Sequence, residues 1–331
     1  MLSMPRKSAP VAVTTDNFIR AESDKHFGHV VREGGFGRFN HYRELMPIDR
    51  QGVVRANRDT LYSAAVFDLD AAPVTVTLPD TGTRFSSMMV TDQDHYVRLV
   101  TYEPGPCTLN RGTIGTRYVL VAIRILVDPG DPSDLKQAHA VQNSIQVSQR
   151  NRGSFEVPNW DPSSQKSVRD ALLMLGSMLT DSGKMFGSKD QVDPIRHLIG
   201  TAIWWGGNPE KDAIYFNVRP EMNDGTTMYR LNVKDVPVDG FWSVSVYNAE
   251  GHFEPNPLHA YTLNSLTAVK GPDGSIDIQF GGCTNNTANC LPIMKGWNYT
   301  VRLYRPRTEI LSREWKFPAA RVDGMQELQA A

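Results

Sequence analysis

The chain has 331 residues and a mass of 37.0 kDa, a length that usually divides into about two domains. Its 35 Lys and Arg residues nearly balance 36 Asp and Glu residues, giving a formal net charge of −1, which argues against a nucleic-acid-binding protein. The sequence contains no apolar run of the roughly 18 residues that a membrane-spanning helix needs.

The first part of the chain predicts one helix followed by strands. A helix is expected over residues 15–31, with Thr15 as its N-cap and Asp16 in its first turn. Segments rich in β-branched and aromatic residues then predict strands at 61–70, 74–78, 84–91, 96–102 and 118–128. The polar residues 92–95 separate two of these segments and predict a hairpin turn.

The middle of the chain predicts helices. Asp131, Asp161 and Asp193 are each followed by proline, and this pair is typical of an N-cap with proline at the first helical position. Apolar residues at helical spacing from Val168 to Leu179 indicate an amphipathic helix that packs on a partner. We therefore expect a helical insert.

The last part returns to short strands, expected at residues 214–218, 228–233, 241–247, 261–269, 276–280 and 297–304. Hairpin turns are expected at 248–251 and 272–274. The predicted fold is mainly β: a β-rich N-terminal α+β domain at 12–130, a helical linker at 131–208, a C-terminal β-sandwich or jelly-roll-like domain at 209–318, and a tail at 319–331.

The predicted C-terminal strands alternate, so that each has one apolar face and one polar face. The polar face lacks Lys and Glu, the usual solvent-facing residues, so we expect it to be covered by the other domain or by a ligand. An ordinary solvated sheet face is the alternative. Arginine and asparagine donate to carboxylates or hydroxyls, and tyrosine stacks. The candidate substrate-binding residues are Tyr215, Asn217, Arg230, Tyr247, Arg302 and Tyr304.

The densest polar cluster of the N-terminal half is the segment from Asn57 to Ser63. Its Arg58, Asp59 and Tyr62 are candidates for binding an acidic group and moving a proton. A structural turn with an Arg–Asp pair is the alternative. His95 and Tyr96 follow at a hairpin end, where they are either further catalytic candidates or simply exposed.

Two arginines start or interrupt an apolar strand. If Arg117 or Arg124 is buried, its charge needs an acidic partner, and Asp59 and Asp68 are the candidates. Arg117 is also a candidate substrate-binding residue.

Other signals are few. Cys283 and Cys290 flank a polar loop and form either a small disulfide loop or two free thiols. The chain has no phosphate-binding loop, dinucleotide fingerprint, nucleophile elbow or zinc-protease motif, so we predict neither a nucleotide cofactor nor a metal. Basic residues near the start are followed by no apolar stretch, which predicts a cytoplasmic protein unless a processed form is exported.

Several long segments resemble one bacterial family. They are residues 57–69, 92–96, 239–247, 256–258, 261–265 and 297–306. The chain is similar, from about residue 15 to 318, to the two-domain family whose parts are called domains of unknown function twelve-fifty-four and twelve-fourteen. The resemblance implies a β-rich N-terminal domain, a helical linker and a C-terminal jelly-roll-like domain. It implies no settled reaction, and it associates the chain with a family in which export is common.

Two functional hypotheses follow. The first is an enzyme, a hydrolase or lyase, that acts on a small polar or sugar-like substrate in a cleft between two β-domains. The second is a non-catalytic module that binds a glycan or metabolite or assembles into a homo-oligomer. The polar strand face is compatible with both, and the fold class does not discriminate between them.

Overall fold

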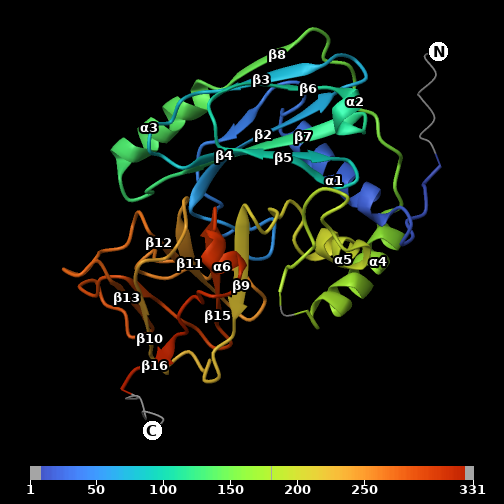
Figure 1. The fold of residues 1–331 in the computed structure, drawn as a ribbon. Helices are drawn as coiled ribbons and strands as arrows, with labels where there is room; N and C mark the ends of the chain where they lie inside the picture. The colour runs from blue at the N-terminus through green and yellow to red at the C-terminus, as the bar shows by residue number, and fades with distance from the viewer. Residues whose placement is uncertain (1–8, 180, 325–331) are drawn as a thin grey trace. The chain divides into compact units, whose positions relative to one another are not determined.

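The computed structural model describes residues 9–179 and 181–324, which form two compact units (Figure 1). Unit 1 holds residues 9–43, 61–126 and 133–210. Unit 2 holds residues 44–60, 127–132 and 211–324. The division differs from the consecutive segments predicted from the sequence, because residues 44–60 pack with the C-terminal strands and the helical residues pack with the N-terminal strands.

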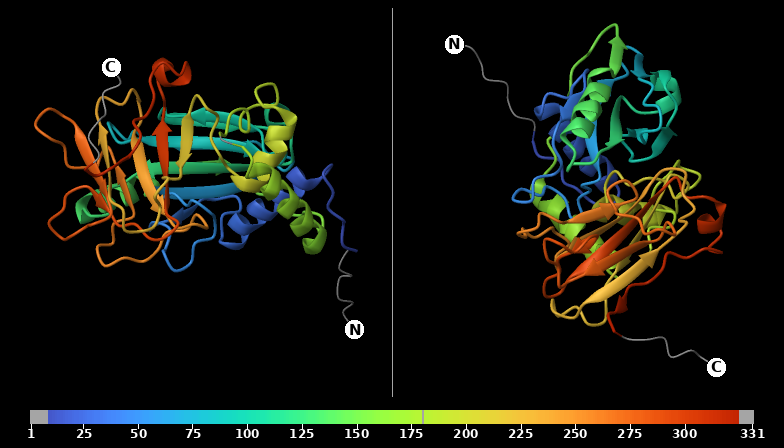
Figure 2. Two further views of the ribbon diagram at one scale, coloured as in Figure 1. Left: turned by 90° about the horizontal axis from the view of Figure 1, so that it is seen from below. Right: turned by 90° about the vertical axis from the view of Figure 1, so that its left-hand side faces the viewer.

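Unit 1 is built on a five-stranded sheet with the order β1-β2-β7-β4-β5. Figure 2 shows the strands of this sheet side by side (blue to green). The strands are β1 (Asn40–Tyr42), β2 (Thr60–Asp68), β7 (Tyr118–Leu126), β4 (Ser86–Asp92) and β5 (Val97–Thr101). A smaller antiparallel sheet has the order β6-β3-β8, from Gly105–Leu109, Val74–Leu78 and Gln146–Gln149. The antiparallel pairing of β4 with β5 confirms the hairpin predicted at residues 92–95.

The helices of unit 1 are α1 (Phe18–Arg32), α2 (Arg111–Ile114), α3 (Pro132–Asn143), α4 (Pro162–Gly176) and α5 (Pro194–Ile203). The side chains of Asp161 and Asp193 accept backbone N–H bonds and cap α4 and α5, as predicted. The predicted cap of the first helix is wrong, because Asn17 and not Thr15 occupies the N-cap of α1. An apolar cluster that includes Phe18, Leu172 and Ile199 packs α1, α4 and α5 together.

Unit 2 contains two four-stranded sheets, with the orders β12-β11-β15-β9 and β14-β13-β10-β16. The first comprises β9 (Ala213–Val218), β11 (Trp242–Tyr247), β12 (Thr262–Asn264) and β15 (Asn298–Tyr304). The second comprises β10 (Tyr229–Val233), β13 (Ile276–Phe280), β14 (Cys290–Leu291) and β16 (Arg321–Val322). A short helix, α6 (Thr308–Leu311), follows β15. One buried core takes side chains from both sheets, including Trp242, Val244, Leu231 and Val301.

Three details of unit 2 bear on the predictions. Residues 272–274 form a turn but no hairpin, because β12 and β13 belong to different sheets. The strand predicted at 261–269 stops at Asn264, whose side chain accepts the N–H bonds of the next turn. Cys283 and Cys290 form a disulfide, with Cα atoms 5.6 Å apart, which decides between the two alternatives left open by the sequence.

Within residues 9–179 and 181–324, no helix has both the length and the apolar character required to span a membrane.

Candidate functional site

The polar face of the β12-β11-β15-β9 sheet is covered, as the strand pattern predicted. Its central side chains are all buried: Ser243, Ser245 and Tyr247 on β11, and Asn298, Thr300, Arg302 and Tyr304 on β15. Side chains of this face bond to residues 55–59, which we call the strap, and the strap belongs to unit 2. The strap and the strand residues that contact it form the strap site.

The side chain of Arg302 binds the backbone of the strap. Its Nη2 donates to the carbonyl of Arg55 at 2.9 Å and to the hydroxyl of Tyr247 at 2.6 Å, and its Nη1 donates to Ser245 at 2.9 Å. The Tyr247 hydroxyl in turn donates to the carbonyl of Ala56 at 2.7 Å. Burial disfavours the charge of Arg302, but the phenols and the carboxyl nearby outweigh it and raise the pKa of this guanidinium.

Asp59 is fixed on one side only. Its Oδ1 accepts hydrogen bonds from Thr262 Oγ1 at 3.0 Å and from Asn264 Nδ2 at 3.1 Å. Its Oδ2 is buried and has no hydrogen-bond partner among the residues that the structure describes. A buried carboxylate oxygen without a donor is uncommon and marks a position where a donor group of a ligand would be accommodated.

Two further arginines lie at the strap site without an acidic partner. In the described residues, neither Arg55 nor Arg58 has a carboxylate within salt-bridge distance. The Arg55 guanidinium lies 5.8 Å from the ring centroid of Tyr247, and that of Arg58 lies 5.3 Å from the ring centroid of Tyr261. Burial is the main cause that lowers the pKa of both guanidinium groups. The strap site therefore has a surplus of positive charge.

The other predicted residues of unit 2 divide into two groups. Tyr304 accepts a hydrogen bond from Asn57, and Asn217 accepts one from Thr300 Oγ1 at 2.8 Å. Tyr215 lies beside Arg302 in the β9–β15 pairing. Arg230 does not join them, because β10 belongs to the other sheet and the guanidinium pairs with Asp323 at 3.1 Å. Its side chain is 54% exposed, so the shared face predicted for Arg230 is wrong.

The remaining predicted residues belong to unit 1. Arg117 pairs with Asp68 at 2.9 Å, one of the two partners that the sequence offered for it. The guanidinium of Arg124 lies 5.4 Å from the ring centroid of Tyr62. The catalytic roles predicted for Tyr62, His95 and Tyr96 stay predictions.

His95 is not an exposed turn residue. It has a φ of 62°, in the left-handed region that few non-glycine residues adopt, and the residue is 1% exposed. The backbone N–H of Gly206 donates to Nε2 at 2.9 Å, so the ring proton sits on Nδ1 and is directed to Thr201 Oγ1 at 2.8 Å. Burial, with His197 and His26 nearby, holds the pKa of His95 well below its usual value.

His95 and Tyr96 are members of a stack of five rings in unit 1. The order is His26, Trp205, His95, His197 and Tyr96, with successive centroids 4.3, 5.1, 5.4 and 4.8 Å apart. Since the inner imidazoles are buried and bonded to backbone or threonine groups, the stack fixes the hairpin end against α5.

Both halves of the chain match known family models. Residues 36–112 match the model described as "Protein of unknown function (DUF1254)", and residues 213–308 match "Protein of unknown function (DUF1214)". The chain belongs to this two-domain family. In this family member, the strap lies in the first matched region and β9, β11, β12 and β15 lie in the second.

Solved structures share the fold of this family member. The VPA0106 protein from Vibrio parahaemolyticus is 18% identical with a TM-score of 0.69, over 93% of this chain and 98% of its own. An uncharacterised protein from Burkholderia cenocepacia is 12% identical with a TM-score of 0.53, over 92% of this chain and 86% of its own. A comparison with curated proteins gave no match.

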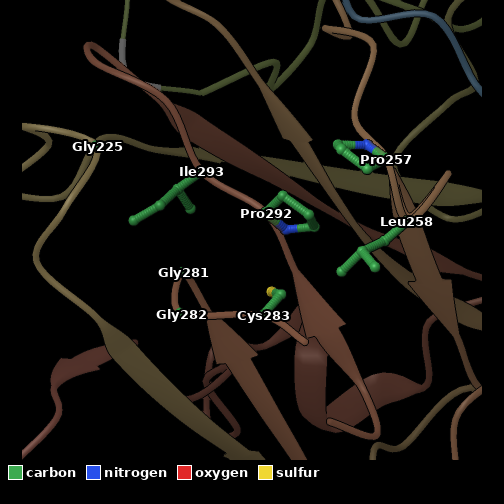
Figure 3. A pocket seen from close by; sticks show the side chains of 8 residues that line it. All are labelled: Gly225, Pro257, Leu258, Gly281, Gly282, Cys283, Pro292 and Ile293. Carbon is green, nitrogen blue, oxygen red and sulfur yellow. The ribbon is translucent and has the colours of Figure 1, made fainter. Parts of the chain in front are cut away.

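Two cavities are candidates for ligand sites. A cavity of about 250 Å³ in unit 2 is lined by Pro257, Leu258, Pro292, Ile293, Cys283 and three glycines, so it offers no charged or hydroxyl side chain (Figure 3). A cavity of about 290 Å³ in unit 1 lies against α1 and includes charged residues. No group of three or more His, Cys, Asp or Glu side chains in the described ranges is arranged to hold a metal ion.

The candidates named from the sequence leave out several residues of the strap site, among them Arg55, Thr262, Asn264 and Asn298. Strand alternation could have identified two of them, because Thr262 and Asn264 are two residues apart on one face of β12. Nothing in the local sequence connects Arg55 with Asn298, since 243 positions separate them.

Proposed function

We propose that the protein is an enzyme, a hydrolase or lyase, that acts at the strap site on a small, polar, sugar-like substrate carrying an anionic group. The observation that carries this proposal is the state of Asp59. One of its carboxylate oxygens is fixed by two donors, while the other is buried without a partner in the described residues. A carboxylate fixed in this way keeps one oxygen oriented to take or return a proton.

The arginines supply the substrate preference in this proposal. Arg55 and Arg58 have no acidic partner among the described residues. An anionic substrate group would therefore pair with these two guanidinium groups and neutralise their positive charge. The rings of Tyr247 and Tyr261 lie beside these guanidinium groups, and in this proposal a sugar ring would pack against them. Arg302 acts as a positioning residue, because its hydrogen bonds end on the strap backbone and on Tyr247.

The test is a substrate screen with matched variants. The full chain is incubated with uronic acids, aldonic acids and their esters and lactones, and substrate loss is followed by NMR. In the Asp59→Asn variant, which keeps the shape of the side chain, we expect turnover to fall by about 100-fold or more. The control is Asp277→Asn, at an exposed carboxylate bonded to Asn232, which should leave turnover unchanged.

Two results would contradict the enzyme. The first is a folded Asp59→Asn protein with full turnover. The second is a panel member that the wild type binds without converting it and that Arg58→Gln no longer binds. This second result would favour the non-catalytic binding module, whose support is the pair of arginines without acidic partners.

A further inference from the structure

The cavity of unit 1 is lined by one face of α1 and by residues of the segment 155–165. Its volume of about 290 Å³ is at the small end of the range for metabolite sites. Its lining includes charged, amide and aromatic side chains: Asp24, Lys25 and Arg32 from α1, and Phe155, Trp160 and Gln165 from the other wall. None of these residues takes part in the strap site, which belongs to unit 2.

Asp24 places a buried negative group in the wall of this cavity. Its side chain is 2% exposed, and its oxygens accept hydrogen bonds from Gln93 Nε2 at 2.8 Å and from the indole N–H of Trp160 at 3.0 Å. No cation lies within salt-bridge distance of it in the described residues. Burial is the main cause that raises the pKa of this carboxyl. A cationic ligand group would supply the missing partner.

Two cations lie at the exposed side of the same cavity. The side chain of Lys25 is 50% exposed, and its Nζ lies 3.8 Å from Oε1 of Glu22. Arg32, seven residues further along α1, is also exposed. The cavity thus combines a negative group in its wall with positive groups at its opening. A ligand with only a negative or only a positive charge would pair with one of these groups and leave the other without a partner.

Gly28 allows the Arg32 guanidinium and the Phe155 ring to lie against the backbone of α1 in the cavity wall. A Cβ atom at this position would lie 3.3 Å from Nη1 of Arg32 and 3.7 Å from the ring of Phe155. Gly28 sits inside α1, where any other residue except proline would favour the helix more strongly. Because Gly28 has no side chain, these two groups lie beside α1, and a larger residue here would displace them or extend into the cavity.

We propose that this cavity binds a small zwitterion of the α-amino-acid type, with its ammonium group toward Asp24 and its carboxylate toward Lys25 and Arg32. The aromatic walls, Trp160 and Phe155, pack against the ligand side chain and favour the cationic end. Lys25 and Arg32 bind the carboxylate by charge-assisted hydrogen bonds. This site is independent of the strap site, so either assignment can fail without the other.

The first experiment compares three probes on the full chain by isothermal titration calorimetry: L-phenylalanine, phenethylamine and 3-phenylpropionate. The two analogues each lack one charged group of the amino acid. Since each charged contact typically changes affinity by about tenfold or more, we expect the dissociation constant of L-phenylalanine to be at least about tenfold below that of either analogue. No measurable binding of L-phenylalanine, or equal binding of one analogue, overturns the proposal.

The second experiment uses two substitutions at one position. Gly28→Leu fills the cavity and is expected to abolish binding, while Gly28→Ala adds one methyl group beside the flexible end of Arg32 and should retain it. Both residues favour a helix, so α1 is expected to remain folded, and melting temperatures check this. A folded Gly28→Leu protein that binds L-phenylalanine as tightly as the wild type contradicts the site.

Discussion

The Nη2 atom of Arg302 donates a hydrogen bond of 2.9 Å to the backbone carbonyl of Arg55, across 247 positions of the chain. This bond fixes the strap to the centre of the sheet, because β15 is flanked by β11 and β9. The strap arrives from the N-terminal half of the sequence, yet its backbone is satisfied by side chains of the C-terminal half. The acidic residue of the strap site, Asp59, is held in the same manner.

Replacing Arg302 tests how much the strap depends on this side chain. In Arg302→Gln, the carbonyls of Arg55 and Ala56 lose buried donors, and we expect the free energy of unfolding to fall by about 3 kcal/mol. Urea unfolding of the two proteins measures this difference. Arg230→Gln is the control, since its exposed ion pair with Asp323 contributes at most about 0.5–1 kcal/mol. A change as small as that of the control would show that the strap is held by other contacts.

The pH dependence of stability has a contribution from Asp92. Burial is the main cause that raises the pKa of this carboxyl from 3.8 to about 6. Between these values the folded protein keeps a proton that the unfolded chain has released, so stability falls as the pH rises through this window. Asp92→Asn removes this contribution. Above pH 6 we expect the variant to be more stable than the wild type by up to about 3 kcal/mol, and therefore to melt at a higher temperature.

Melting temperatures of both proteins from pH 4 to 8 provide this measurement. The exposed Asp170, which pairs with Lys166, supplies the control Asp170→Asn. If Asp92→Asn and the wild type differ by a constant amount over this range, the pKa of Asp92 is not raised.

The disulfide of unit 2 closes a loop between Cys283 and Cys290. Reduction releases the constraint on the unfolded chain, and for a loop of this length we expect a loss of about 2 kcal/mol. Urea unfolding with and without dithiothreitol measures it, and Cys107→Ser should not change the difference. Of the 3 cysteines, only Cys107 is free, so a thiol assay on the denatured, unreduced chain should find one group.

The ring of His95 is expected to stay neutral in mildly acidic solution. Because burial and its histidine neighbours lower its pKa, the folded protein binds no proton there while the unfolded chain does, and stability falls as the pH drops below about 6.5. Long-range ¹H–¹⁵N spectra should show protonated Nδ1 and unprotonated Nε2 at pH 7 and pH 5.5. The signals are assigned by their loss in His95→Gln, and a titration midpoint near 6.5 would contradict the assignment.

Local sequence determined most of the elements and the orientation of their side chains. The Asp–Pro pairs predicted α4 and α5 because capping involves only neighbouring residues. Strand alternation placed Trp242 and Val244 in the core and Tyr247 on the opposite face, since the period of two is a property of the strand itself. Arg230 shows the limit of this reasoning, because alternation gives the face of a strand but not the sheet to which the strand belongs.

Only the tertiary structure determined which distant residues contact one another. The strand pattern predicted that Tyr247 and Arg302 share a polar face and favoured a covered face over a solvated one, with another domain or a ligand as the cover. The cover is the strap, held by contacts between residues about 190 to 250 positions apart. Burial of His95 and the cavity at Asp24 were equally out of reach, because long-range packing creates both, and no short-range pattern records which distant backbone or side chain will satisfy a given polar group.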